Sequence, residues 1–287
     1  MSSDLARISE DDLIASFDEL VADDVIVYGP HEVIQQSASG FPIEFRLCPS
    51  FAKKPHTVGA SNPSFSQSRK WGPGSDMYCP DERLIVAKLN GTHDLALNLF
   101  CVDRPQLLLL TLDSYRRQFE PLDNDDFKAV LEVLRRWNNM YIIYNCSEVG
   151  GCSRTHKHMQ GLRGPPFAFD ALVHAEGSPK VPFRYFMHHF EQGFQRASAV
   201  DLLQVYNNII GQCRTMLGLS EADVCPHNVV LWNDRIIVIP RRKGFIEGAS
   251  ANAAGMLGSI WVPDKKEMDE WMRLGCANVL RELGVPR

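Results

Sequence analysis

The chain has 287 residues, 45% of them hydrophobic and 23% charged, a composition typical of one large or two modest globular domains. Its formal net charge of -5 argues against a general nucleic-acid-binding surface, because such surfaces need an excess of Lys and Arg. Any phosphate chemistry therefore requires a local basic pocket. The first twenty residues lack the features of a signal or transit peptide, and no apolar run is long enough to cross a bilayer. We expect a cytoplasmic protein, with a nuclear location left open.

The first half of the chain predicts a helix, a long loop and a sheet. Residues 11–21 place apolar side chains at helical spacing behind an acidic start, which indicates an amphipathic helix. Residues 60–80 are rich in Ser, Gly and Pro, which predicts a loop that is functional or mobile. Strand patterns follow at 83–88, 94–100 and 104–111 and indicate an antiparallel series. A helix capped by Asp123 or Asn124 is expected to cover this sheet.

The second half mixes the same kinds of element. A strand at 141–144, a glycine-bearing loop at 147–154 and a strand at 156–160 are followed by a Pro-rich break at 164–166. We then expect a helix from Ala199 to Leu217, a hairpin turning at Asn233–Asp234 and a last helix over 265–283. These elements predict an α+β fold with an antiparallel sheet flanked by helices. We expect a catalytic part at 1–170 and a second part at 171–287, or one compact unit.

The segment from Asn145 to Gln160 concentrates groups suited to phosphate chemistry. Strand side chains alternate between faces, so His156, His158 and Gln160 are expected on one face. Gly150–Gly151 permits close backbone approach to an anion, and Ser153 adds a hydroxyl donor. A histidine is largely neutral at cytosolic pH, so a free ring nitrogen can attack phosphorus without prior deprotonation. The pattern therefore favours covalent catalysis by histidine.

Ser153, His156, His158 and Gln160 stand in the pattern Ser-x-x-His-x-His-x-Gln. This pattern resembles the branch of the histidine-triad (HIT) superfamily that contains the galactose-1-phosphate uridylyltransferases and the fungal-type diadenosine tetraphosphate (Ap4A) phosphorylases, or ATP adenylyltransferases. The resemblance implies a HIT-like fold, with His158 as the nucleophile that becomes adenylylated. It also implies that Ser153 and Gln160 hold phosphate oxygens and that His156 orients the nucleophilic ring. We assign Asn145 and Gly151 of the same segment to substrate binding.

The resemblance covers nearly the whole chain. Residues 95–111 are similar to the family's two nucleotide-cradling strands, with Asn98 at the ribose or phosphate position. The segment 45–55 resembles one whose lysine approaches the polyphosphate, a role that we carry to Lys54. Residues 225–258 resemble the family's C-terminal portion and complete the nucleotide pocket. The chain departs from the family at Leu99, where Lys is usual, and at Arg104–Pro105–Gln106, where the family usually has a Pro-Glu-His run.

Several residues permit a second interpretation. Cys146, Cys152, His156 and His158 lie close in sequence and are possible zinc ligands, but the chain has no Cys-x-x-Cys pair, so we expect no metal. We expect no tightly bound cofactor, and leave open magnesium carried by the nucleotide. The charge run 241–243 could bind the phosphates of the distal nucleotide, but charge runs at strand ends usually face water, and we expect the same here. Surface or ordinary polar roles are expected for three histidines without partners at motif spacing, which are His188, His189 and His227.

The resemblance implies phosphorolysis of Ap4A to ATP and ADP by reversible adenylyl transfer through an adenylyl-histidine. The expected partners are small-molecule nucleotides and phosphate (Ap4A, ATP, ADP and inorganic phosphate), with no nucleic acid and no membrane. Three alternatives stay open at this point. The chain could be a dinucleoside polyphosphate hydrolase, another nucleotidyl transferase, or a nucleotide-binding protein without turnover.

Overall fold

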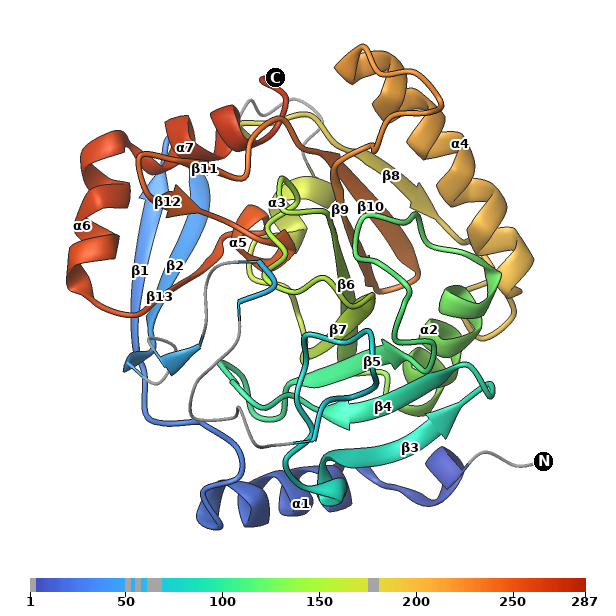
Figure 1. Cartoon of the computed structure of the whole chain (residues 1–287). Coiled ribbons are helices and arrows are strands. Elements are labelled where there is room, and N and C mark those ends of the chain that lie inside the picture. Colours follow the sequence, from blue (N-terminus) through green and yellow to red (C-terminus); the bar gives the residue numbers. More distant parts are fainter. Residues whose placement is uncertain (1–3, 50–52, 55–57, 61–68, 175–180) are drawn as a thin grey trace.

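A computed structural model describes residues 4–49, 53–54, 58–60, 69–174 and 181–287 (Figure 1). Its centre is an eight-stranded sheet in the order β3-β4-β5-β7-β6-β9-β10-β8, with every neighbouring pair antiparallel. The strands are β3 (Ile85–Leu89), β4 (His93–Leu97), β5 (Leu107–Thr111), β6 (Met140–Cys146), β7 (His158–Arg163), β8 (Phe186–His189), β9 (His227–Trp232) and β10 (Arg235–Pro240). The predicted α+β fold with an antiparallel sheet flanked by helices is confirmed.

Both faces of this sheet are covered. Helices α2 (Asn124–Arg136) and α4 (Ala199–Leu217) pack on one face, where Tyr144 of β6 and Val229 of β9 join their core. Ile143, the neighbour of Tyr144, belongs to a second core on the opposite face. Because strands covered on both faces bury every side chain, β5 and β6 read as continuous apolar runs rather than alternating ones.

A second, three-stranded sheet lies over the opposite face and was not predicted from the sequence. It contains β1 (Glu32–Ala38), β2 (Phe41–Leu47) and β13 (Ser259–Val262), with β13 parallel to β2. The last helices of the chain lie beside β1 and β2, so segments from the two ends of the sequence are side by side (Figure 1). The eight-stranded sheet likewise takes strands from both sides of residue 170. The division into 1–170 and 171–287 stays a prediction.

The remaining elements are short connections and covering helices. They are η1 (Asp4–Arg7), α1 (Glu10–Ala22), η4 (Glu82–Leu84), α3 (Phe169–Val173), β11 (Phe245–Ile246), β12 (Ala249–Ser250), α5 (Ala253–Met256), α6 (Lys265–Leu274) and α7 (Cys276–Leu283). The single last helix predicted over 265–283 is wrong, because Gly275 adopts a φ of 78° and separates α6 from α7. Within the described residues, no helix combines the length and apolarity that a membrane crossing requires.

The predicted long loop at 60–80 is described only in part, since residues 61–68 lie outside the described residues. From residue 69 onward the chain forms a bridge between Lys70 and Tyr78 and packs against the segment around Ser114. This described part carries Ser75 and Asp76 to the strand that holds the histidine motif. It therefore contributes to the candidate site.

Candidate active site

The glycine loop between β6 and β7 is shaped by contacts that only glycine permits. A Cβ at Gly150 would lie 2.3 Å from the carbonyl oxygen of Cys146, and one at Gly151 would lie 2.6 Å from the carbonyl oxygen of Ala251. Gly151 also has a φ of 86°, a conformation that costs a residue with a side chain. Gly150 therefore lets the loop turn tightly on the end of β6, and Gly151 lets it pack against the C-terminal part of the chain.

His158 is held in one tautomer by its own strand. Its Nδ1 lies 2.8 Å from the backbone carbonyl oxygen of His156, which can only accept, so Nδ1 carries the proton and donates. Burial lowers the pKa of His158 to about 4, with smaller contributions from His156 and Lys54. The imidazole is therefore neutral at pH 7. Its Nε2 keeps a free lone pair, which is the form that a nucleophile needs.

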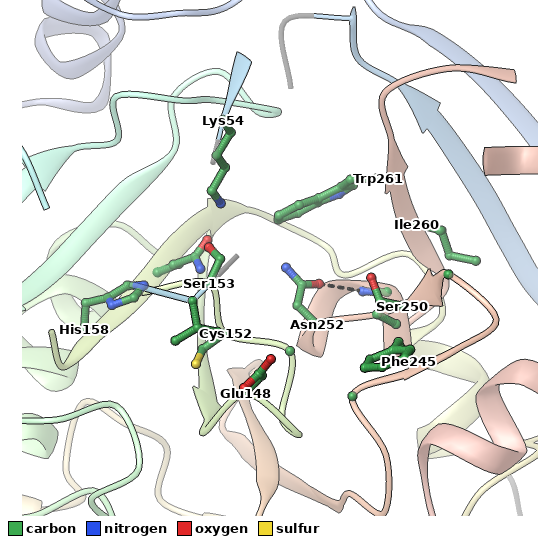
Figure 2. Close-up of a pocket in the computed structure, with 17 residues that line it drawn as sticks. Lys54, Glu148, Cys152, Ser153, His158, Phe245, Ser250, Asn252, Ile260 and Trp261 are labelled. Carbon is green, nitrogen blue, oxygen red and sulfur yellow. Dashed lines mark hydrogen bonds between the residues drawn. The ribbon is translucent and has the colours of Figure 1, made fainter. Parts of the chain in front are cut away.

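The side chain of His158 stands on the wall of a cavity of about 260 Å³. Figure 2 shows Lys54, Ser153 and His158 on one side of this cavity, with Phe245 and Trp261 across from them. A second, smaller hollow opens beside it toward β4 and β5 and is lined by Asn98, Leu99 and Leu108, among others. Four residues line both spaces, and these are Lys54, Ser153, His158 and Gln160. His158 thus lies where two compartments meet.

The predicted phosphate-binding residues on the shared wall are all polar. The Lys54 amine points into the pocket (Figure 2), and burial, reinforced by the positive charge of Arg154, lowers its pKa to about 8. Lys54 is therefore still mostly protonated at pH 7. Ser153 is half-buried, and both Ser153 and Gly151 line the larger cavity. Lys54, with Arg154 beside it on the smaller hollow, and several hydrogen-bond donors thus line the space around His158.

Asn98 and Gln160 lie at the smaller hollow. The Nδ2 of Asn98 donates to the backbone carbonyl oxygen of Phe100 at 3.1 Å, which fixes the end of β4 next to the hollow. Gln160 is buried except for its face on the two spaces. Its Oε1 accepts a hydrogen bond from Nε2 of Gln106 at 2.8 Å. Gln106, singled out in the sequence only as a departure from a family pattern, is therefore a neighbour of the motif.

His156 supports the site from behind and does not line either space. Its Nε2 donates to the carbonyl oxygen of Thr111 at 3.0 Å, and its Nδ1 accepts from the hydroxyl of Ser75 at 2.8 Å. Both ring nitrogens are therefore occupied. The backbone N–H of His156 donates to the carboxylate of Asp76 at 3.0 Å. His156 contacts the ring of His158 through its backbone carbonyl oxygen rather than through its own ring, and its orienting role stays a prediction.

Sequence reasoning missed Gln118, which holds the backbone of the nucleophile. Its Oε1 accepts from the N–H of His158 at 2.8 Å, and its Nε2 donates to the carbonyl oxygen of His158 at 2.9 Å. Gln118 lies forty positions before His158 in an irregular segment, and it carries no spacing signal. Asp76 and Ser75 were missed for the same reason. Gln118 and Asp76 fix the main chain around the motif, and Ser75 holds the ring of His156.

Asn145 does not lie on the cavity wall, which differs from its predicted contact with substrate. Its Oδ1 accepts from the amide of Asn228 at 2.9 Å and from the N–H of Ala253 at 2.8 Å, and the side chain is buried. The predicted water-facing position of Arg241 is also wrong, because this guanidinium is only 1% exposed. It donates to neutral oxygens, including Oδ1 of Asn228 and the carbonyl of Ala251. Through these hydrogen bonds, Asn145, Asn228 and Arg241 connect the glycine loop with the segment at Ala251 and Ala253.

The C-terminal wall itself was predicted only as a region. It includes the hairpin residue Phe245, which is 66% exposed, together with Asn252 and Trp261. The indole Nε1 of Trp261 donates to the hydroxyl of Ser259 at 3.3 Å. Two aromatic rings and a set of polar groups therefore face the side of the cavity opposite His158, an arrangement suited to a nucleoside.

Zinc ligation was the alternative interpretation of the segment that carries the motif. In the described part of the chain, no group of three or more His, Cys, Asp or Glu side chains is arranged to hold a metal ion. The Nδ1 of His158 and both ring nitrogens of His156 are engaged in hydrogen bonds within the protein. The expectation of a site without metal or tightly bound cofactor stays a prediction.

Comparison with known proteins identifies the family. The model of the Ap4A phosphorylase N-terminal domain matches residues 31–176, about half of the chain, and that of the ATP adenylyltransferase C-terminal domain matches residues 179–286. A search of curated proteins finds no match.

Three crystal structures of yeast Ap4A phosphorylase Apa2 share the fold. One structure of Apa2 has a TM-score of 0.77 at 19% identity, and the match covers 100% of this chain and 99% of that chain. The complex with AMP has a TM-score of 0.74 at 21% identity, covering 96% and 95%. The complex with Ap4A has a TM-score of 0.74 at 20% identity, covering 97% and 98%. With both halves matched by its domain models, the chain belongs to the Ap4A phosphorylase family.

Proposed function

We propose that this chain phosphorolyses Ap4A to ATP and ADP through a covalent adenylyl-histidine at His158. Family membership supports the reaction class, and yeast Apa2 has been crystallised with Ap4A and with AMP. The observation that carries the proposal is the position of His158. Its unprotonated Nε2 faces the junction of two compartments that share four polar or charged residues. A substrate with a nucleoside at each end of a polyphosphate fits such a divided space.

In the first step, Nε2 of His158 attacks the α-phosphorus at one end of Ap4A. An N–P bond forms, the bond from that phosphorus to the bridging oxygen breaks, and ATP leaves with the electron pair of that oxygen. The carbonyl of His156 stabilises the positive ring that develops, because it accepts the hydrogen bond from the proton-bearing Nδ1. Lys54 and Ser153 lie where they can donate to the charged phosphoryl oxygens.

In the second step, an oxygen of inorganic phosphate attacks the same phosphorus. The P–O bond of ADP forms, the N–P bond breaks, and Nε2 recovers its lone pair. Gln160 can donate a hydrogen bond to the transferred group, but its amide cannot accept a proton from water at neutral pH. The site therefore favours phosphate, which arrives already anionic, over water. This preference distinguishes a phosphorylase from a hydrolase.

The proposal includes no resident metal, because the positive charge and the donors are supplied by side chains of the protein, although magnesium can enter with the nucleotide. We further propose that the enzyme acts in the cytoplasm on free nucleotides. Dialysis against a chelator, followed by assays with and without added magnesium or zinc, tests the first point. A requirement for protein-bound zinc would contradict it.

Product analysis tests the reaction itself. Purified protein is incubated with Ap4A and phosphate, and the products are separated by chromatography. We expect ADP and ATP in equal amounts, and turnover that depends on phosphate. His158→Ala should lower the rate by several powers of ten, whereas His189→Ala, on the exposed edge strand β8, should not change it. Rapid release of AMP without phosphate would indicate a hydrolase, and binding without turnover would indicate a nucleotide-binding protein.

A further inference from the structure

Two buried amide side chains adjoin each other behind the cavity. Gln106 directly precedes β5, and Gln160 of β7 is paired with Leu108 of β5. Side chains two positions apart on a strand share a face, so Gln106 and Gln160 are diagonal neighbours on one side of the sheet. Their contact is a hydrogen bond from Nε2 of Gln106 to Oε1 of Gln160, with a length of 2.8 Å.

The direction of this bond is set by a backbone group. The N–H of Val102 donates to Oε1 of Gln106 at 3.0 Å. A backbone N–H has no acceptor capacity, so the oxygen of the Gln106 amide must face Val102 and its NH₂ group must face Gln160. Gln160 is thereby obliged to present its oxygen to Gln106. One backbone donor thus determines the orientation of both side-chain amides.

This orientation leaves the NH₂ group of Gln160 for the cavity. Its Nε2 donates to none of the described residues, while the side chain lines both spaces beside His158. Phosphoryl oxygens only accept hydrogen bonds. If the side-chain amide of Gln160 were rotated by 180°, its carbonyl oxygen would face the phosphoryl oxygens instead, and the two would repel each other.

We propose that Gln106 is a positioning residue that keeps the donor face of Gln160 directed at the transferred phosphoryl group. The inference rests on the proposed function, because it assigns to Gln160 a bond to the substrate of that reaction. Gln106 itself touches no substrate. Gln106 affects the reaction only through Gln160. Its substitution should therefore lower activity only when Gln160 is present, whereas a general structural role would lower activity in either case.

Gln106→Glu tests the orientation directly because glutamate has nearly the same shape. The ionised carboxylate of this variant only accepts, so it would draw the NH₂ group of Gln160 away from the cavity. We expect a loss of about a hundred-fold in the rate of adenylyl transfer near pH 8, the typical effect of losing one donor. At lower pH, the protonated carboxyl group of the variant donates to Oε1 of Gln160 as the native glutamine does, so activity relative to wild type should recover.

Other titrating groups surround this position. Cys101, Asp103 and Lys54 interact electrostatically near the backbone of Gln106, and His158 lies on the adjoining wall. The ratio of variant to wild-type rate at each pH cancels their own titration to first order. Gln212→Glu, the same substitution on the exposed surface of α4, is the matched control for the added negative charge and should stay within two-fold of wild type.

A double-mutant cycle separates positioning from folding. In a Gln160→Ala background, Gln106→Glu should cause no further loss, because the residue through which it acts is absent. If Gln106→Glu does not fold, Gln106→Leu replaces it in the same cycle. That variant leaves Gln160 free to rotate, and we expect a loss of about ten-fold with Gln160 present and none without it.

The proposal is overturned if Gln106→Glu is as active as Gln212→Glu at every pH, or if the activity that Gln106→Glu loses relative to wild type is the same at every pH. It is also overturned if either Gln106 variant loses as much activity in the Gln160→Ala background as it does with Gln160 present. Wild-type enzyme is assayed first for ADP and ATP formation. A failure there contradicts the proposed function, whereas normal wild-type turnover with unaffected Gln106 variants contradicts only this inference.

Discussion

The Nη1 of Arg241 lies 2.7 Å from Oδ1 of Asn228, and both side chains are buried behind the active-site cavity. The same nitrogen donates to the carbonyl oxygens of Gly150 and Ala251. All hydrogen bonds that Arg241 makes with described residues go to neutral oxygens. Burial lowers the pKa of Arg241 to about 9, so it is still a cation at neutral pH. One buried charge thus joins the glycine loop to the opposite wall.

Replacement of Arg241 should therefore damage stability and activity together. Arg241→Met leaves several buried carbonyl groups without donors, and we expect a loss of about 3 kcal/mol in the free energy of unfolding. Displacement of the glycine loop should also raise KM for Ap4A. Arg242→Met, at the exposed neighbouring position, should stay within about 0.5 kcal/mol of wild type. Urea unfolding and steady-state kinetics measure both effects, and equal behaviour of the two variants would show that Arg241 has no such role.

The buried histidine His227 should make stability fall in mild acid. Its Nδ1 donates to the carbonyl of Cys225 and its Nε2 accepts from the hydroxyl of Tyr206, an arrangement that requires a neutral ring. Burial lowers the pKa of His227 to about 4, below the value of about 6.5 expected in the unfolded chain. The unfolded state therefore binds more protons between pH 6.5 and 4, so the stabilisation is complete above this window and decreases as the pH falls through it.

The expected loss from this one group between pH 7 and pH 5 is roughly 2 kcal/mol. Urea unfolding at the two pH values measures it. His227→Asn should show a correspondingly smaller difference between the two pH values, whereas His189→Asn, at an exposed position, should retain the wild-type difference. The same pH dependence in all three proteins would rule out His227 as the source.

The pH dependence of the adenylylation rate should be set by His158 on the acid side and by Lys54 on the basic side. Because the pKa of His158 is lowered to about 4, the nucleophile stays neutral through pH 6, and the rate should fall only as the pH approaches that value. Because the pKa of Lys54 is lowered to about 8, the rate should fall again as the pH rises through that range and Lys54 loses its charge. Single-turnover kinetics without phosphate measure both limbs. An acid limb centred near 6.5 would contradict the buried, neutral histidine.

Gln160→His should change which acceptor completes the reaction. A histidine at this position can remove a proton from water, whereas a glutamine cannot. We expect the wild-type enzyme to release little AMP. The variant should release more AMP and correspondingly less ADP, because water then competes with phosphate for the adenylyl group. Chromatography of products at several phosphate concentrations measures this partition. An unchanged ratio of AMP to ADP would show that Gln160 does not control the acceptor.

The elements predicted best are those with local signals. Helix α4 begins and ends at the predicted residues, Ala199 and Leu217, because a Ser198 cap and the left-handed Gly218 mark its ends. The hairpin of β9 and β10 turns at Asn233 and Asp234, both with positive φ, as the sequence indicated. By contrast, β13 pairs in parallel with β2 from more than two hundred positions away, and no local pattern reports such a contact.

The same division applies to the site. Ser153, His158 and Gln160 lie within eight positions and were found as one motif, and the structure places all three on a shared wall. Gln118 and Asp76 were missed because the hydrogen bonds that give them a role form only when distant segments meet. Asn145 was placed in the site from its position in the sequence, yet its side-chain Oδ1 accepts hydrogen bonds from Asn228 and from the backbone N–H of Ala253. Position in the motif alone therefore does not distinguish a residue that lines the cavity, such as Gln160, from a buried residue behind it, such as Asn145.

The most direct test of the proposed chemistry is the isolation of the adenylylated protein. Wild-type enzyme is exposed briefly to Ap4A labelled at the α-phosphate, without phosphate, and is then denatured and digested. We predict label on the peptide that contains His158, stable in base and labile in acid, and its transfer to ADP when phosphate is added before denaturation. His158→Ala should take up no label, while His189→Ala should label as wild type does. Full turnover to ADP and ATP by an enzyme that never carries label would show direct displacement and contradict the covalent role of His158.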